Sequence, residues 1–273
     1  MARRVTTART SRATSAGAAL IAAALAAFAP VRAQVTPAQP AAPVSKACEN
    51  SATATAESTP LPNVAAALAQ RKALRILAMG AAPGRVSARA GGYTALIESM
   101  LANALKGIEV TMINRGVSGE LAANAATRMK NEVALNDPDL VLWQVGTNDA
   151  LAYVSSNEFG ATIKDQVDWL KAHKVDVVLV GLQFAPEMLR DQHYVRIRET
   201  LRALAAKEGV IVIRFYEAMQ ILNQTAVPGA EPAEVGVERD EAGYNCLAQY
   251  VARAITLGVF AKTMPQWPAP SRP

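Results

Sequence analysis

Histidine and cysteine are scarce in this chain, with two of each among 273 residues, and aromatic residues make up only 5%. The sequence contains no Cys/His spacing typical of zinc sites, no basic stretch interleaved with aromatic residues and no Gly-rich phosphate loop after its first predicted strand. These absences argue against a zinc site, a nucleic-acid-binding module and a nucleotide-binding fold. We therefore expect no metal and no cofactor.

The positive charge of the chain comes from its first residues. The formal net charge is +5, and residues 1–33 contain five arginines and no acidic residue. Without this segment the remaining chain is formally neutral. A basic protein that attracts nucleic acid is therefore not what the composition predicts.

Residues 1–33 have the pattern of a secretory signal peptide. Arginines are followed by an apolar run from Ala16 to Ala29 and then by Val31-Arg32-Ala33, so we predict cleavage after Ala33. The apolar run is too short for a membrane anchor, which needs roughly 20 residues. The arginine pair Arg3-Arg4 lacks the context of a twin-arginine signal, so the Sec route is favoured. We expect a periplasmic or secreted protein with no transmembrane segment after cleavage.

The mature chain is long enough for one α/β domain with flanking segments. Residues 34–68 are rich in Ala, Pro and Thr, which favours a linker or an extended arm, and residues 263–273 form a Pro-rich tail. The predicted domain, residues 69–262, alternates β-branched runs with helical stretches. This alternation predicts a three-layer α/β/α fold with a five-stranded parallel sheet, of the flavodoxin-like kind.

Five near-continuous apolar runs are expected to be buried parallel strands: Leu74–Met79, Glu109–Asn114, Leu140–Val145, Asp176–Leu182 and Val210–Phe215. The clearest helices are predicted at Tyr93–Leu105, Leu121–Leu135, Phe159–His173, Tyr194–Lys207 and about Asp240–Leu257. Ligands of such sheets bind beyond the carboxyl ends of the strands. The loops after the first three strands are therefore the expected site.

The two cysteines are Cys48, before the domain, and Cys246, near the start of the last helix. An oxidising compartment favours pairing of an even number of cysteines, so we predict a disulfide between them. The alternative is that Cys246 is a small core residue and Cys48 a free thiol.

Two blocks carry a family resemblance. Asn114-Arg115-Gly116-Val117-Ser118-Gly119-Glu120 follows the second strand, and Gln144-Val145-Gly146-Thr147-Asn148-Asp149 follows the third. Together they resemble the corresponding blocks of the SGNH (GDSL-type) hydrolases, over about Leu74 to Leu257. The resemblance implies that Gly119 gives a backbone N–H, and Asn148 a side-chain N–H, to the oxyanion of an acyl transfer.

The same resemblance implies that the reacting groups are missing. The family's nucleophilic serine should follow the first strand, where Ala82 stands in Gly80-Ala81-Ala82-Pro83-Gly84. With Gly243-Tyr244 as anchor, Val235 takes the position of the catalytic aspartate and Glu238 that of the histidine. The substitutes that remain are Ser118 and Ser87 as nucleophiles and His193 or Glu238 as base, and each also has an ordinary structural interpretation as a turn, loop or cap residue.

We therefore expect an exported SGNH-fold protein that has lost catalysis, a pseudoenzyme whose retained cleft binds a small acylated or carbohydrate ligand. The alternatives are an active esterase or acyltransferase that uses relocated residues, and an envelope scaffold in which only the fold and the amino-terminal arm matter. The oligomeric state does not follow from the sequence.

Overall fold

The structure is a computed structural model that describes Cys48 and residues 59–80, 92–184, 188, 190–224 and 232–261, except for the side chains of residues 221–224 and 232–241. All of these residues belong to the unit formed by residues 38–273. The predicted signal peptide, residues 34–58 of the predicted linker apart from Cys48, and the predicted tail lie outside the described residues.

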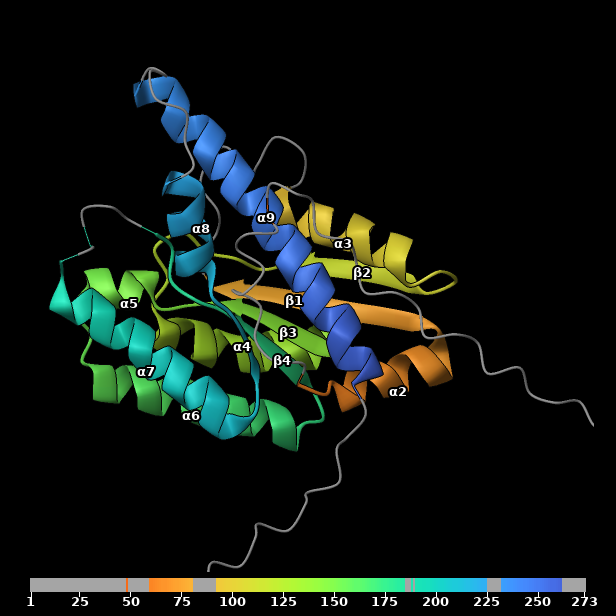
Figure 1. Ribbon diagram of the computed structural model, residues 1–273. Helices are drawn as coiled ribbons and strands as arrows, with labels where there is room; N and C mark the ends of the chain where they lie inside the picture. Colours follow the sequence, from red (N-terminus) through yellow and green to blue (C-terminus); the bar gives the residue numbers. More distant parts are fainter. Residues whose placement is uncertain are drawn as a thin grey trace, which may run out of the picture. The chain divides into compact units, whose positions relative to one another are not determined.

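A five-stranded parallel sheet forms the centre of the fold, with strand order β2-β1-β3-β4-β5. Figure 1 shows helices on both of its faces, which confirms the predicted three-layer architecture. The strands are β1 (Ala73–Gly80), β2 (Glu109–Asn114), β3 (Leu140–Gln144), β4 (Asp176–Val180) and β5 (Ile211–Ile213).

Alternate side chains of the strands point to two separate cores. One core includes Leu74, Ile76 and Leu142 and is covered by α2 (Pro62–Arg71), α3 (Gly92–Ala104), α8 (Phe215–Gln224) and α9 (Pro232–Phe260). The other includes Val141 and Trp143 and is covered by α4 (Ala122–Asn136), α6 (Ser156–Ala172) and α7 (Gln192–Glu208). Because both faces are covered, the three central strands are almost entirely apolar, as the sequence predicted.

Local sequence explains where several helices begin and end. Ser155 caps α6 by accepting a hydrogen bond from the backbone N–H of Glu158, and Asp191 caps α7 by accepting from two backbone N–H groups. Gly209 ends α7 in the left-handed conformation that glycine adopts at low cost. These caps lie close to the helix ends expected from the sequence.

The amino-terminal side of the domain corrects one expectation. Residues 62–68, assigned above to the linker, belong to α2, which begins with a proline in its first turn and buries Val64 and Ala67. The backbone N–H of Leu61 donates to the carbonyl of Gly258 at 3.0 Å, which joins this helix to the far end of the chain. The ordered fold therefore begins before residue 69.

The predicted disulfide is confirmed. Cys48 and Cys246 are bonded across a sequence separation of 198 residues, with their Cα atoms 5.4 Å apart, and both are 2% exposed. The Tyr250 hydroxyl also donates to the carbonyl of Cys48 at 2.7 Å. Cys48 is thus held against α9 by a covalent bond and by a hydrogen bond.

Helix α9 begins earlier than expected. It runs from Pro232 to Phe260, whereas the sequence predicted a start near Asp240. In the part of the chain that the structure describes, no helix is both long enough and apolar enough to cross a membrane.

Candidate functional site

The loop after β2 runs alongside the carboxyl end of β1. The backbone N–H of Arg115 donates to the carbonyl of Ala78 at 2.8 Å, and that of Val117 donates to the carbonyl of Gly80 at 2.9 Å. Gly80 has φ +88°, and a Cβ added there would lie 1.9 Å from the carbonyl oxygen of Gln144 on β3. The first and third strands approach so closely at this point that only glycine fits.

The loop after β3 is tied to the loops on both sides of it. The Asn148 side-chain amide donates to the carbonyl of Glu120 at 3.0 Å. One Asp149 carboxylate oxygen accepts from the backbone N–H of Ala122 at 2.9 Å, and the Thr147 hydroxyl accepts from the backbone N–H of Gln183 at 2.9 Å. The ends of the first four strands are therefore connected by hydrogen bonds. We call residues 114–122, 145–149 and 181–184 the loop cluster.

Gly119 and Asn148, the two predicted oxyanion donors, both lie in the loop cluster. Gly119 is exposed with φ +76°, and among the described residues its N–H has no hydrogen-bond acceptor. The Asn148 amide uses one N–H on the Glu120 carbonyl, and a primary amide has a second to offer. The chemistry available here is donation of N–H groups to a ligand oxygen.

Asp149 is a buried acid next to Asn148 to which the sequence analysis gave no role. It is 2% exposed, and its burial raises the pKa of the carboxyl group. Its Oδ1 accepts the N–H of Ala122 at the start of α4, and its Oδ2 is buried without a hydrogen-bond partner in the described structure. Asp149 therefore holds the beginning of α4 against the loop after β3.

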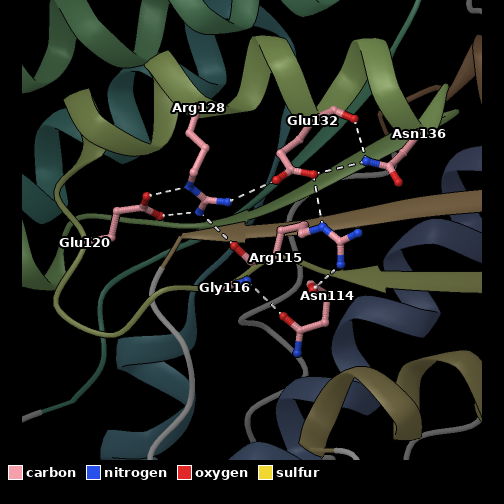
Figure 2. Close-up of polar contacts among 7 residues, drawn as sticks. All are labelled: Asn114, Arg115, Gly116, Glu120, Arg128, Glu132 and Asn136. Atoms are coloured by element: carbon pink, nitrogen blue, oxygen red, sulfur yellow. Dashed lines mark hydrogen bonds and ion pairs between the residues drawn. The ribbon is translucent and has the colours of Figure 1, made fainter.

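A network of ion pairs holds the loop after β2 onto α4 (Figure 2). The Arg128 guanidinium makes two hydrogen bonds to the Glu120 carboxylate, at 3.0 and 2.8 Å, and donates to the carbonyl of Arg115 at 2.7 Å. Glu132 binds Arg115 at 3.0 Å and receives a bond from Asn136 at 3.1 Å. The pKa of Arg128 is raised, first by its hydrogen bonds to Glu120. Since Glu120 follows Gly119, this network positions the loop that carries the first donor.

The positions of the missing triad are described only in part. Ala82 and the alternative nucleophile Ser87 lie outside the described residues. Val235 and Glu238 are part of α9 rather than of a loop before it, and their side chains lie outside the described structure. The last helix therefore includes both positions, and the roles assigned to these four residues stay predictions.

The two remaining substitutes are placed but not paired. Ser118 is exposed in the turn before Gly119. His193 lies in the first turn of α7, where its ring stacks on Tyr153 with centroids 5.2 Å apart. Its Nε2 is buried and has no partner in the described part of the chain, Ser118 included. The other histidine, His173, stacks on Trp169 at the end of α6.

Two further features of the described residues bear on where a ligand could bind. Within the described residues, no group of three or more His, Cys, Asp or Glu side chains is arranged to hold a metal ion. A cavity of about 580 Å³ lies along β5 and α7, and Arg202 and Arg214 are among its lining residues. None of its lining residues belongs to the loop cluster, so this cavity is separate from the predicted oxyanion donors.

Sequence comparison finds relatives among esterases. Residues 47–261 match the model of the non-GDSL lipase-like family. The esterase TesA of Pseudomonas aeruginosa is 24% identical over 125 residues, which are 46% of this chain and 61% of TesA. An arylesterase of Vibrio mimicus is 30% identical over 101 residues, 35% of this chain and 50% of the arylesterase. The chain thus spans between half and two thirds of these curated relatives.

Two solved structures share the fold at lower sequence identity. LAE5, an alpha/beta hydrolase enzyme from the metagenome of Lake Arreo, has a TM-score of 0.55 at 21% identity over 67% of this chain and 96% of its own. A catalytic mutant of Axe2, an acetylxylan esterase from Geobacillus stearothermophilus, has a TM-score of 0.54 at 19% identity over 67% of this chain and 94% of its own. At such identities the likeness shows a shared fold.

Proposed function

The chain belongs to the non-GDSL lipase-like family and is an SGNH-type hydrolase by family, and from that premise we propose that it binds an acylated or carbohydrate ligand in the bacterial envelope without cleaving it. The observation that carries the proposal is a contrast between two sets of positions. The predicted oxyanion donors Gly119 and Asn148 both belong to the hydrogen-bonded loop cluster, whereas alanine stands at residue 82, the predicted position of the nucleophile.

Acyl transfer needs a nucleophile, a base that takes its proton and donors for the oxyanion. The methyl group of Ala82 cannot form an acyl-enzyme, and Val235 and Glu238 replace the aspartate and the histidine. With the nucleophile and the base both absent, only the donors remain. Donors of this kind still bind a carbonyl or hydroxyl oxygen in its ground state, which supports binding without turnover.

The family match agrees with the altered first block. The matched family is described as non-GDSL, and the block after β1 reads Gly80-Ala81-Ala82-Pro83, without the Gly-Asp-Ser sequence. TesA and the arylesterase are esterases, but their aligned regions cover 61% and 50% of those proteins. Because these matches cover only part of each esterase, we do not carry ester cleavage over to this chain, and its loss is part of the proposal.

Export is supported by two independent features. Residues 1–33 have the charge and hydropathy pattern of a signal peptide. The disulfide between Cys48 and Cys246 is of the kind that persists in oxidising compartments and is rare in the cytosol. A periplasmic or secreted location accounts for both.

The loss of catalysis can be tested with the purified mature protein and p-nitrophenyl acetate. We expect no turnover beyond that of an Asn148→Ala variant, and no covalent labelling by a fluorophosphonate, because no activated serine is present. Turnover that disappears in Asn148→Ala, together with a fluorophosphonate adduct on Ser118 or Ser87, would establish the active-esterase alternative instead.

Ligand binding is tested separately, by calorimetric titration with acetylated oligosaccharides. We expect the wild-type protein to bind and the Asn148→Ala variant to bind several-fold more weakly, because one amide donor is lost. Urea unfolding of the variant checks that the fold persists, since Asn148 also holds the Glu120 carbonyl. Equal affinity of the two proteins would place the ligand away from the predicted donors.

A further inference from the structure

An exposed aromatic residue lies beside the loop cluster. Tyr153 follows helix α5 (Thr147–Leu151) and is 69% exposed. One face of its ring stacks on the imidazole of His193, with centroids 5.2 Å apart and an interplanar angle of 23°. Its hydroxyl donates to Oδ2 of Asp191 at 3.2 Å. We call Tyr153, His193 and Asp191 the tyrosine platform.

The tyrosine platform is held in place from both sides. Asp191 accepts the backbone N–H groups of His193 and Tyr194 at 2.7 and 3.2 Å, and these bonds lower the pKa of its carboxyl group, which therefore stays charged at neutral pH. The hydroxyl of Tyr153 is fixed by the same carboxylate, and its ring is backed by His193. One ring face is thus presented to solvent in a defined orientation.

The backbone at Tyr153 makes this exposure unusual. Tyr153 has φ +54°, a conformation that is costly for a bulky residue and is normally adopted by glycine or asparagine at the end of a helix. An aromatic side chain usually offsets such a cost by burial, but this one is mostly exposed. Lys72, Asp137 and Lys174 also have positive φ, but Tyr153 is the bulky aromatic residue among them, and strained residues are enriched at ligand-binding sites.

Tyr153 follows the same short helix that carries one predicted donor. Asn148 is in the first turn of α5, and Tyr153 comes five residues later in the sequence, just beyond the end of that helix. Helix α5 packs against α7, whose first turn provides His193.

We propose that the tyrosine platform is a pyranose-binding subsite, in which a sugar ring stacks on the exposed face of Tyr153 and one of its hydroxyls donates to Asp191. The proposal deepens and rests on the proposed function, because the acyl substituent of the same sugar would lie at Gly119 and Asn148. It identifies the ligand as an acylated carbohydrate rather than a lipid.

The chemistry of the tyrosine platform fits a sugar. A pyranose has an apolar face of C–H groups and a rim of hydroxyls, and the platform offers an aromatic face with a carboxylate at its edge. Hydrogen bonds from hydroxyls to a charged carboxylate are stronger than those between neutral groups. An acyl chain would need an extended apolar groove to bury its length, which a single ring face does not offer.

The test is calorimetric titration of the mature protein with xylose, glucose and N-acetylglucosamine oligosaccharides, each acetylated and deacetylated. We expect Tyr153→Ala to weaken binding of an acetylated oligosaccharide about tenfold. Tyr153→Phe should retain most of the affinity, because it keeps the stacking face. Leu135→Ala is the matched control, since Leu135 is 80% exposed at the far end of α4, and it should bind like the wild type.

The outcomes separate this proposal from the proposed function. If Tyr153→Ala binds as tightly as the wild type while Asn148→Ala does not, the sugar subsite is wrong and binding at the donors stands. If p-nitrophenyl acetate binds and no oligosaccharide in the panel does, the sugar subsite is again overturned. If no probe binds at all, both proposals fail. Weaker binding in Tyr153→Ala alone, with Leu135→Ala unchanged, supports the subsite.

Discussion

Removal of the disulfide between Cys48 and Cys246 should destabilise the domain severely, and the size of the effect can be worked out from the chain it closes. A loop of 198 residues corresponds to about 5 kcal/mol of lost chain entropy in the unfolded state at 25 °C. The hydrogen bond from the Tyr250 hydroxyl to the Cys48 carbonyl remains after the disulfide is lost and retains part of the contact. We therefore expect a loss of about 3–5 kcal/mol, which is a large share of the total stability of most domains.

The measurement is urea unfolding of the mature protein, followed by far-ultraviolet circular dichroism with and without reductant. In a parallel thermal unfolding experiment, a loss of this size should lower the melting temperature by roughly 6–20 °C for a domain of this length. The Cys48→Ala/Cys246→Ala variant should unfold like the reduced protein and should not respond to reductant. The reasoning is refuted if a thiol titration shows both cysteines reduced while the unfolding midpoint stays at its oxidised value.

Three further predictions concern the loop cluster and the residues that support it. Gly80→Ala should lower the free energy of unfolding by at least about 3 kcal/mol or prevent folding, because its Cβ would overlap the Gln144 carbonyl. Gly107→Ala is the control: Gly107 has φ +79° but open space around it, so this variant should lose only about 1–2 kcal/mol. Thermal unfolding of both variants measures the difference. Arg128→Gln should lower the free energy of unfolding in urea by about 2 kcal/mol, because it leaves the carboxylate of Glu120, only 6% exposed, without its ion-pair partner. Arg75→Gln is the control and should change stability by under about 0.5 kcal/mol, because its partner Asp137 is 88% exposed. Equal effects of the two substitutions would contradict the role of Arg128. Burial raises the pKa of Asp149 and of Asp176, so these two carboxyl groups stay protonated to higher pH in the folded protein than in the unfolded chain. Protonation of the two groups therefore stabilises the folded protein below their ordinary pKa of 3.8, and this stabilisation declines as pH rises through the raised pKa values. Asp149→Asn should reduce that decline in unfolding measured from pH 3.5 to 8, and an unchanged pH dependence would show that Asp149 does not contribute.

The sheet and most helices could be predicted from the sequence, because buried strands are short apolar runs and the helices between them carry caps. Glu109–Asn114 was predicted with the bounds that the structure has. The last strand is shorter than predicted because apolar residues resume after Arg214 in α8, so that Phe215 begins a helix rather than ending a strand. Apolar character alone does not separate these two outcomes.

Helix α2 could not be predicted because its stability comes from distant contacts. Its sequence is short and rich in alanine, like the segment before it, and Leu61 at its start is held by the carbonyl of Gly258. The proline at its beginning and the spacing of Val64 and Ala67 are local signals that agree with a helix. The Ala-, Pro- and Thr-rich composition of the residues before α2 favours a linker more strongly than these two signals favour a helix.

The candidate site was predictable in part for the same physical reason. Parallel strands bring their carboxyl ends to one edge, so Gly119 and Asn148 were expected to be neighbours, and Asn148 indeed binds the carbonyl of the residue after Gly119. The tyrosine platform was not foreseen as a unit, because Tyr153 and Asp191 are 38 residues apart and neither belongs to a recognised block. Pairings of this kind depend on how α5 packs against α7.

The hydrogen bonds that join the loop cluster have a consequence for how such a protein can change. They run between main-chain groups and the side chains of Thr147, Asn148 and Asp149, so they are made within the loop cluster itself. A substitution at a reacting position can therefore alter chemistry while leaving the architecture of the loops intact. Catalysis and scaffold are in this sense separate properties, so the former can be lost, or regained, with little effect on the latter.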